Sequence, residues 1–556
     1  MGKRWKTSRR IPGGTWFPMT LLLVLGLLPA RTQEIAGDVY WLYFTDKGDN
    51  GYDIDRPEEF LTPRSLDRRA WQGLGVDERD EPLTEAYLEQ IRELGGQIRH
   101  RSRWLNGVAL TECTEELFLD LLALPFTDTL PWEPATEESL VPGRSDQPRF
   151  SGPVPGAEAY DYGIAREQVE LIQTRELHRW GYRGEGVHVA VLDAGFYNVD
   201  SLTSFAPMRA DGRLLGTRNF VRDRSVFRET STHGMHVLSI LGGEWDGNLV
   251  GTAPKASYLL CMTEHPDQET RLEEIAWIEA AEYADSLGFD VINTSLGYSL
   301  FDDPGSNYTY EDMDGRTTFI SRAASLTASR GMIACISAGN QGNDPWHYIT
   351  APADATNILT VGAVDSLGTI AAFSSRGPTA DGRVKPDVSA MGVQTGVQTV
   401  ADQLARGSGT SFSSPTIAGS VASLWQAFPE TPAQELMEAV RESAYLHESP
   451  NNDIGHGIPN FARALHLLTS TRKLTPESEV LVYPNPVRDR IHVAVAGQTN
   501  GPAQIRLFSP DGVLRAIHTV PLPADLDLGP DLEPGLYILQ LSVSGLLYHQ
   551  RILRLK

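Results

Sequence analysis

Four short motifs in the middle of the chain contain residue types that can transfer an acyl group. Ser411 lies in GTSFSSPTIAGSVASLW, where Gly409 and Thr410 form a predicted turn before a predicted apolar helix. A serine at the start of a helix exposes its hydroxyl, and its backbone N–H points into a region that favours negative charge. The oxyanion of acyl transfer needs such donors already in place. A helix-capping role for Ser411, Ser413 or Ser414 is the alternative interpretation.

His233 is the candidate base, because a serine hydroxyl attacks efficiently only when a neighbouring base accepts its proton. It lies in STHGMHVLSILGG, a pattern typical of a short helix that begins at His233 and ends at Gly242 and Gly243. His236 is the rival. It lies one turn further along, where we expect it to be buried in packing, so we assign the base to His233.

Asp193 is the candidate acid partner of the base, and Asn340 is the candidate oxyanion donor. Asp193 follows the apolar run VHVAVLDA, and a carboxylate directly after a buried strand is unfavourable unless it has a partner. Such a partner can be an imidazole, whose tautomer the carboxylate holds. Asn340, in MIACISAGNQG, offers an amide donor for the oxyanion, whereas Asn293 falls within its predicted strand. Turn or cap roles are the alternatives for Asp193 and Asn340.

The elements that must position these residues alternate between residues 160 and 468. Strand-like apolar runs separated by predicted helices indicate an α/β fold, a parallel sheet with helices on both faces. In such sheets ligands bind outside the carboxyl ends of the strands. Asp193, Ser295 and Asn340 finish three of these runs, so we expect them at one edge. The predicted strands are VHVAVLDA, ASYLLCM, FDVINTSLG, MIACISAGN and NILTVGAV, and the predicted helices span 270–287, 317–330 and 411–427.

The flanking regions have different patterns. Residues 34–130 combine strand runs such as VYWLYF and GVALTEC with an amphipathic helix at 84–94, which predicts a small α+β domain. Residues 131–159 are rich in proline, glycine, serine and charge, which predicts an exposed linker. Residues 475–556 alternate short strands with turns such as SPDG, which predicts a β-sandwich.

Composition excludes some classes of partner. A chain of 556 residues is too long for one core. Acidic residues outnumber basic ones by 72 to 48, for a net charge of −24, which disfavours nucleic acid as a partner. Cys113, Cys261 and Cys335 form no metal or disulfide pattern, so we expect buried thiols, with a Cys261 to Cys335 bridge as the alternative. Basic residues followed by a short apolar stretch predict a signal peptide at 1–33.

The four motifs, in the order Asp193, His233, Asn340 and Ser411, closely resemble the subtilases, the subtilisin-like serine peptidases. The resemblance covers residues 160–468 and includes AVLDAGF, HGMHV, NTSLG, SAGNQG, FSSRGP, KPDVSA and GTSFSSP. It implies a triad of Asp193 as acid, His233 as base and Ser411 as nucleophile, with Asn340 as oxyanion donor.

The same resemblance implies how a peptide substrate is held. Ser295, Leu296 and Gly297 match the segment that pairs with the substrate main chain. Ala338 and Gly339 match a wall of the pocket for the side chain before the scissile bond.

Two residues depart from the family pattern. Met235 stands where a small hydroxyl residue is usual, and we expect it to alter packing only. Tyr298 stands where a glycine usually follows SLG, and we expect it to narrow or rebuild the entrance to the specificity pocket.

The implied reaction requires no cofactor and no catalytic metal. Some subtilases bind calcium for stability, and an acidic insert follows the SLG motif. Its spacing lacks the EF-hand pattern, so we interpret it as a solvated loop. The acidic residues of this insert are Asp302, Asp303, Asp312 and Asp314.

The flanking regions carry resemblances of their own. Residues 34–130, through RSLDRR and SRWLNGV, resemble subtilase propeptides, which implies an intramolecular inhibitor. Residues 475–556, through VYPNPVRDRIHV, PGLYILQL and the final RILRLK, resemble the sorting domain of type IX secretion substrates, which implies the secretion machinery as a partner.

We therefore predict a secreted or cell-surface serine endopeptidase that cleaves proteins through an acyl-enzyme intermediate. The alternative is a catalytically inactive, surface-binding protein on the same fold. A third interpretation makes the C-terminal region a binder of carbohydrate or substrate.

Overall fold

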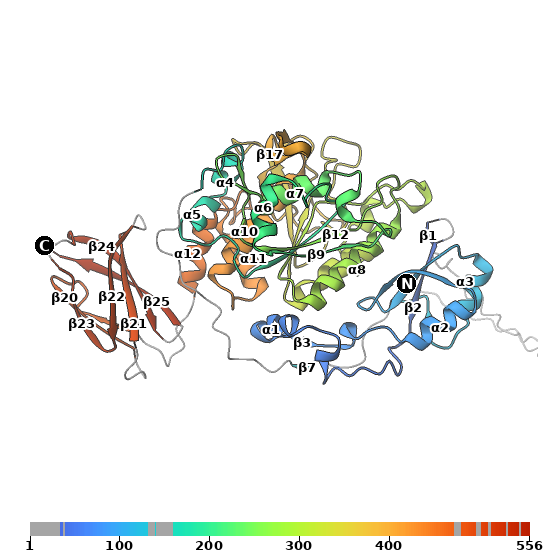
Figure 1. Cartoon of the computed structure of the whole chain (residues 1–556), viewed down its shortest axis with the longest axis horizontal. Helices are drawn as coiled ribbons and strands as arrows, with labels where there is room; N and C mark the ends of the chain where they lie inside the picture. Colours follow the sequence, from blue (N-terminus) through green and yellow to red (C-terminus); the bar gives the residue numbers. More distant parts are fainter. Residues whose placement is uncertain are drawn as a thin grey trace, which may run out of the picture.

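The computed structural model describes residues 34–36, 39–131, 139–140, 160–471, 480–495, 502–509, 513–529, 532–543 and 546–555. The predicted signal peptide and most of the predicted linker lie outside these residues, as does most of the SPDG turn. Figure 1 shows a central part flanked by smaller N-terminal and C-terminal parts. Among the helices of the described ranges, none has the length and apolar character needed to cross a membrane.

A parallel sheet forms the centre of the molecule. Its strand order is β16-β15-β14-β13-β8-β12-β9, and every neighbouring pair is parallel. The predicted strands are confirmed, but both edge strands were missed. β9 is only half-buried and lacks an apolar run, and no sequence signal set apart the four residues of β16. The bounds are β8 His188–Asp193, β9 Leu214–Asn219, β12 Ser257–Met262, β13 Val291–Thr294, β14 Ile333–Ser337, β15 Leu359–Val364 and β16 Val388–Met391.

Helices cover both faces of this sheet, as predicted. Val189 and Val191 of β8 face one core, and Ala190 and Leu192 face the other, because successive strand side chains alternate. The first core is covered by α7 (His233–Gly242), α10 (Thr410–Ala427), α11 (Ala433–Ser443) and α12 (Phe461–Thr471). The second is covered by α8 (Arg271–Leu287) and α9 (Phe319–Leu326). Shorter helices include α4 (Arg166–Leu171), α5 (Thr174–Arg179) and α6 (Ala206–Ala210).

The cysteines are buried free thiols, so the alternative of a Cys261 to Cys335 bridge is wrong. Cys261 on β12 belongs to the core under α8, whereas Cys335 on β14 belongs to the core under α10. Two strands separate them, and their side chains point to opposite faces of the sheet.

The N-terminal part is a small antiparallel sheet with helices on one face. Strands run in the order β1-β2-β5-β4, and β6 also pairs with β2. Leu42 and Phe44 of β2 pack under α2 and α3, whereas Trp41 and Tyr43 point the other way and join the core of the central part. The bounds are β1 Glu34–Ala36, β2 Val39–Phe44, α1 Pro63–Gln72, β3 Gly75–Val76, α2 Glu85–Glu93, β4 Gln97–Ser102, β5 Gly107–Thr111, α3 Glu115–Leu122, β6 Thr127–Asp128 and β7 Ser139–Leu140.

The C-terminal part is a sandwich of two antiparallel sheets. One has the order β19-β20-β23 and the other β22-β21-β24-β25. Ile491 and Val493 of the first sheet share a core with Ile505 and Leu539 of the second. The bounds are β19 Val480–Tyr483, β20 Arg490–Val495, β21 Pro502–Phe508, β22 Leu514–Pro521, β23 Ala524–Asp527, β24 Gly535–Val543 and β25 Leu546–Arg554.

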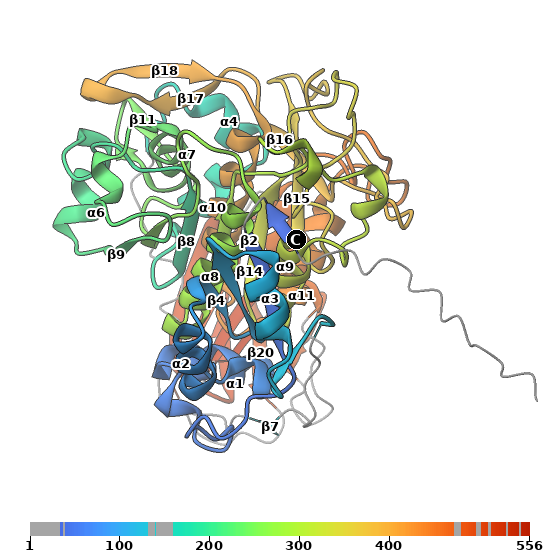
Figure 2. The same ribbon diagram turned by 90° about the vertical axis from the view of Figure 1, so that its right-hand side faces the viewer.

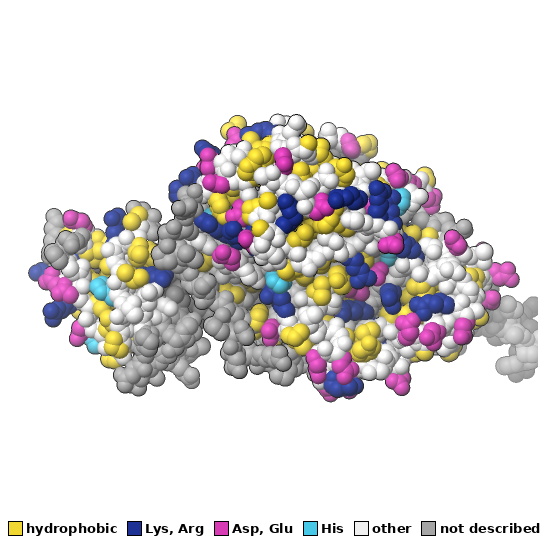
Figure 3. All heavy atoms as spheres, viewed as in Figure 1, with side chains coloured by type: hydrophobic (Ala, Val, Ile, Leu, Met, Phe, Trp, Pro, Cys, Tyr) yellow, Lys and Arg dark blue, Asp and Glu magenta, His cyan; other side chains and the backbone are white. Residues whose placement is uncertain are grey.

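The N-terminal and central parts meet along α8 and α9. Figure 2 shows β2 and β4 in front of these helices, and β4 packs on α8. Acidic and basic side chains are interspersed over the face drawn in Figure 3.

Buried ion pairs join the two parts at the carboxyl end of α8. Arg68 and Arg69 of α1, and Arg103 after β4, all bind the carboxylate of Asp285, which is 0% exposed. Arg68 also donates to the carbonyl oxygen of Phe289, just beyond α8, where positive charge complements the helix dipole. One carboxylate therefore compensates several guanidinium groups from the N-terminal part.

Replacing the carboxylate of Asp285 should strongly lower the free energy of unfolding of the full-length chain. Asp285→Ala removes a carboxylate that buried arginines share and leaves Arg69 with Asp80 alone, and breaking a buried ion pair typically lowers the free energy of unfolding by about 3–5 kcal/mol. Urea unfolding of the full-length chain in a Ser411→Ala background, followed by tryptophan fluorescence, measures the change. Glu85→Ala, which breaks the exposed pair with Arg92, is the control and should change stability by less than about 1 kcal/mol. Equal stabilities of the two variants would contradict the role of Asp285.

Candidate active site

The predicted site residues meet at the carboxyl ends of three neighbouring strands. Asp193 is the last residue of β8, Ser295 directly follows β13, and Asn340 lies shortly after β14. These strands are adjacent and parallel in the order β14-β13-β8. The expectation of one shared edge is confirmed.

Asp193 and His233 form a hydrogen-bonded pair. His233 is the first residue of α7, and its Nδ1 lies 2.7 Å from Oδ1 of the fully buried Asp193. Helix α7 approaches β8 closely because the next residue is Gly234. A Cβ on Gly234 would lie 2.6 Å from the carbonyl oxygen of Gly195 and 3.0 Å from Cβ of Asp193.

The pair determines the protonation of His233. Burial lowers the pKa of this imidazole, but the negative charge and hydrogen bond of Asp193 outweigh burial, so the pKa of His233 is raised above 6.5. The ring of His233 also stacks on Phe412, with centroids 6.2 Å apart. His236 is half-buried beside Phe412, and burial together with the charge of His233 lowers its pKa.

Ser411 is the second residue of α10, but its hydroxyl is not directed at His233. It donates to the carbonyl oxygen of Ser295 at 3.1 Å, and the Ser295 hydroxyl donates back to the carbonyl oxygen of Ser411 at 3.0 Å. The structure thus brings Ser411 to the same edge as Asp193 and His233 and holds its hydroxyl against β13.

Asn340 has a free amide donor at this edge. Its Oδ1 accepts hydrogen bonds from the backbone N–H and the hydroxyl of Thr410, at 2.9 and 3.0 Å. These bonds turn Oδ1 of the amide toward α10. Nδ2 therefore stays available as a hydrogen-bond donor. The rival Asn293 is fully buried, and its side chain binds Ser295 and Ser414 instead.

The predicted substrate-binding segments lie side by side. The Ser337 hydroxyl donates to the carbonyl oxygen of Leu296 at 3.3 Å, which ties residues 295–297 to the end of β14. Gly297 is exposed, Ala338 is buried, and Gly339 is half-buried. An extended peptide can therefore reach both segments from solvent.

Tyr298 lies elsewhere than predicted. Its side chain is 1% exposed, its hydroxyl donates to Glu264, and its ring stacks on Phe301. The expectation that Tyr298 narrows the pocket entrance is therefore wrong, because its side chain points into the core under α8. Met235 packs in the other core, as expected.

A cluster of carboxylates beneath this region was missed by sequence reasoning. Glu264, Glu269 and Glu273 bring one carboxylate oxygen each within 4.8 Å of the others. Burial, followed by repulsion from neighbouring carboxylates, raises the pKa of Glu264 to about 8 and that of Glu273 to about 10. Burial therefore favours the neutral form of both carboxyl groups. The available signal was three glutamates within ten residues, across a loop and the start of α8.

Three of the four aspartates of the acidic insert serve local turns, and Asp302 ties the insert to the loop before α8. Asp302 accepts from the backbone N–H of Glu269, and Asp303 caps a short helix. Asp312 and Asp314 bind Thr309 and Thr317, respectively. Asp302 and Asp303 are exposed, as expected for a solvated loop, whereas Asp312 is buried.

Comparison with known proteins identifies the central part. The model of the subtilase family matches residues 184–457. Residues 184–457 are a subtilase domain. Serine protease AprX of Bacillus subtilis (strain 168) is 28% identical over 301 residues, which cover 48% of this chain and 64% of AprX. Subtilisin E of the same strain is 27% identical over 365 residues, which cover 65% of this chain and 81% of subtilisin E. The predicted enzyme class of the subtilase domain, a subtilisin-like serine endopeptidase, is confirmed.

The N-terminal part also matches a family model. The peptidase S8 propeptide domain of Bacteroidota matches residues 39–147, which confirms the predicted propeptide domain. Among solved structures, the prenylagaramide maturation protease PagA is similar to this chain, with 24% identity, a TM-score of 0.42, and coverage of 53% of this chain and 98% of that one.

Removing the charge of Asp193 should lower the pKa of His233. In Asp193→Asn, burial acts on the imidazole without the opposing carboxylate, so the pKa should fall below its native value. NMR titration of the histidine ring signals in a Ser411→Ala background measures it, and His233→Gln assigns the resonance.

The raised pKa of His233 also determines how the stability of the fold changes with pH. Because the folded-state pKa exceeds 6.5, the pair stabilises the fold fully below pH 6.5 and loses this contribution as pH rises through the folded-state value. Asp200→Asn, which breaks an exposed pair with Arg228, should leave the pKa of His233 unchanged. An unchanged pKa in Asp193→Asn would show that Asp193 does not control the imidazole.

Proposed function

We propose that the chain is the precursor of an exported serine endopeptidase with Ser411 as nucleophile, His233 as general base and Asp193 as its acid partner. The observation that carries the proposal is the 2.7 Å contact between Asp193 and His233 beside the start of α10, within a subtilase domain. Asp193 accepts a hydrogen bond from Nδ1–H, which keeps the proton on Nδ1 and the lone pair on Nε2.

The reaction then uses this free nitrogen. His233 Nε2 takes the proton of Ser411 as Oγ attacks the substrate carbonyl carbon, and the imidazolium returns the proton to the leaving amine. Water hydrolyses the acyl-enzyme with His233 again as base. The developing oxyanion is stabilised by Asn340 Nδ2 and by the backbone N–H of Ser411 at the start of α10.

Substrate binding helps to release the nucleophile. The resting hydroxyl of Ser411 donates to the carbonyl oxygen of Ser295, which belongs to the segment proposed to pair with substrate. A substrate N–H that binds this carbonyl displaces the hydroxyl, which then turns to another staggered rotamer toward His233. Hydrogen bonds of this kind commonly tighten only in the substrate complex.

The N-terminal part acts as an intramolecular inhibitor in this proposal. Trp41 packs on Phe319 of α9, with ring centroids 5.4 Å apart, and Arg322 donates to the Tyr43 hydroxyl at 2.8 Å. These contacts cover α9 and bury Trp41 and Tyr43 in a core shared with the central part.

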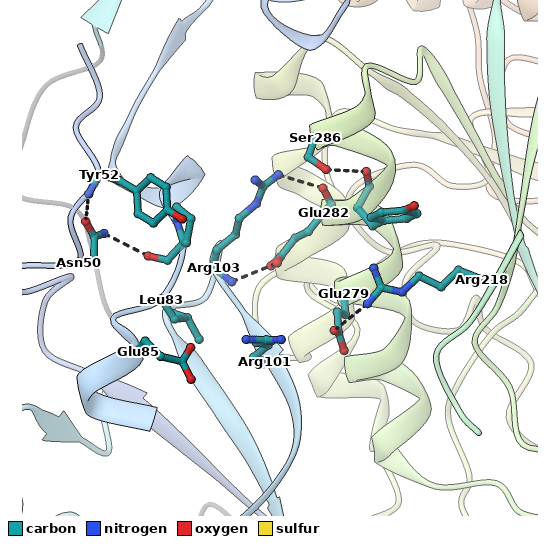
Figure 4. A pocket seen from close by; sticks show the side chains of 12 residues that line it. Asn50, Tyr52, Leu83, Glu85, Arg101, Arg103, Arg218, Glu279, Glu282 and Ser286 are labelled. Atoms are coloured by element: carbon teal, nitrogen blue, oxygen red, sulfur yellow. Dashed lines mark hydrogen bonds and ion pairs between the residues drawn. The ribbon is translucent and has the colours of Figure 1, made fainter. Parts of the chain in front are cut away.

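A cavity of about 510 Å³ remains between the N-terminal part and α8. Figure 4 shows Arg103 joined to Glu282 and Arg218 joined to Glu279 along its wall. Polar, incompletely packed contacts are typical of parts that can separate. This supports a propeptide that is released after folding.

The remaining parts of the proposal concern export and stability. Residues 1–33 are proposed as a signal peptide, residues 131–159 as the maturation zone, and residues 475–556 as a type IX sorting domain that engages the secretion machinery. The two-sheet C-terminal part supports the last of these. The substrates are proteins or peptides, and the mature enzyme is secreted or held at the cell surface. Calcium, as a structural ion without a role in the reaction, remains part of the proposal.

Ser411→Ala should abolish proteolysis. Loss of the nucleophile lowers kcat by roughly 10⁶-fold in a triad of this kind, because the acyl-enzyme cannot form. Casein hydrolysis by the processed protein measures the loss, and a phosphonylating inhibitor followed by mass spectrometry should label Ser411 in the wild type.

Ser413→Ala is the matched control, since the Ser413 hydroxyl only bonds the carbonyl oxygen of Thr410 in the same helix. It should keep most of the activity. A processed wild-type protein that neither cleaves casein nor is labelled at Ser411 would favour the inactive, surface-binding alternative, which no present observation favours.

The two termini of the mature protein should show where the propeptide is removed and whether the C-terminal sandwich is removed. We expect the mature N-terminus within 131–159, because this segment has the composition of an accessible linker. Intact-mass and terminal-peptide mass spectrometry of the exported protein measures it. Ser411→Ala should retain the propeptide if maturation is autocatalytic, and the C-terminus shows whether the sandwich is removed. A mature chain that still begins before residue 60 would contradict the zymogen proposal.

A further inference from the structure

Thr350 lies between residues 295–297 and residues 338–339, the two segments that would hold the substrate side chain. Its backbone N–H donates to the carbonyl oxygen of Ala338 at 3.3 Å. Its neighbour Ala351 exchanges two backbone hydrogen bonds with Tyr298, at 2.7 and 3.1 Å. The main chain of Thr350 is therefore tied to both segments.

The side chain of Thr350 fills the space that two glycines leave open. A Cβ on Gly297 would lie 2.2 Å from Thr350 Oγ1, and a Cβ on Gly339 would lie 3.0 Å from the same atom. Since real Cβ atoms do not approach an oxygen at 2.2 Å, the hydroxyl occupies the position that a side chain at 297 would take. Gly297 and Thr350 are thus complementary in size.

Thr350 is fully buried, and its hydroxyl has no hydrogen-bond partner. Buried hydroxyls are usually bonded, so this one is an exception among the described residues of the region. The side chain is held by packing and by its backbone bonds instead. Tyr298 does not compete for this space, because its hydroxyl binds Glu264 on the far side of the segment.

We propose that Thr350 closes the base of the primary specificity pocket and restricts the residue before the scissile bond to a small side chain such as alanine or serine. This inference rests on the proposed function, because the pocket walls at 295–297 and 338–339 are those of the proposed substrate site. A larger side chain would have to displace Thr350, whose main chain is fixed from both sides, and close-packed sites resist such insertion.

Peptide p-nitroanilides that differ only in the last residue test the proposal. The wild-type mature enzyme should cleave the alanine peptide with a kcat/KM on the order of 100-fold above that of the phenylalanine peptide, the size of discrimination that pocket volume can provide. Thr350→Gly should raise kcat/KM for phenylalanine and reduce the ratio at least about tenfold. Thr350→Ala, with less volume removed, should give an intermediate ratio and serves if the glycine variant folds poorly.

Thr350→Val separates size from polarity. Valine keeps the branched shape and removes only the unpartnered hydroxyl, so the preference for alanine should persist. A wild type that prefers phenylalanine, or a ratio that Thr350→Gly leaves unchanged, would overturn the proposal. Loss of the alanine preference in Thr350→Val would show that the hydroxyl, and not the size of the side chain, makes the selection.

Peptidyl phosphonates provide a second readout that does not require turnover. Their rates of Ser411 labelling, with alanine-like and phenylalanine-like side chains, should show the same ratio and the same change in Thr350→Gly. Labelling with a ratio insensitive to Thr350 would refute this inference alone. Failure of every phosphonate to label Ser411 would refute the proposed function itself.

Discussion

Parallel strands share a carboxyl edge, and the chemistry of this chain depends on that constraint. Because β8, β13 and β14 are neighbours, Asp193, Ser295 and Asn340 meet although about 150 residues separate the first from the last. Two helices complete the arrangement: α7 presents His233 to Asp193, and α10 presents Ser411 to Ser295. The absence of a side chain at Gly234 allows α7 to approach the strand end closely enough for the hydrogen bond between His233 and Asp193.

A buried polar network fixes the first turn of α10 against β13. The amide of Asn293 donates to the Ser295 hydroxyl, which donates to the carbonyl oxygen of Ser411, and Ser414 donates to the other end of the same amide. Linked bonds of this kind in a dry interior hold their members more rigidly than isolated ones. The nucleophile thus moves about its own side-chain torsion while its backbone stays in place, as a preorganised site requires.

Local pattern was enough to predict the sheet, the covering helices and the strand ends that carry polar residues. Apolar runs such as that ending in Asp193 are set by burial on both faces, which a single sequence reveals. The direction of Tyr298 was not predictable in this way, because it depends on Glu264, which is 34 residues earlier in the chain. The rotamer of Ser411 likewise depends on a carbonyl 116 residues away. Half-buried β9 lacks the apolar run that reveals an inner strand.

The face of α8 that meets the N-terminal part carries Glu279, Glu282 and Asp285, three acidic residues spaced one helical turn apart. In the precursor, His100 and Arg103 contact this row. If the N-terminal part is released as proposed, this row becomes a negatively charged ridge in water. Residues 39–131 themselves contain 19 acidic and 10 basic residues, a net charge of 10 − 19 = −9. A freed N-terminal part and the ridge therefore repel each other at long range, and dissolved salt reduces this repulsion.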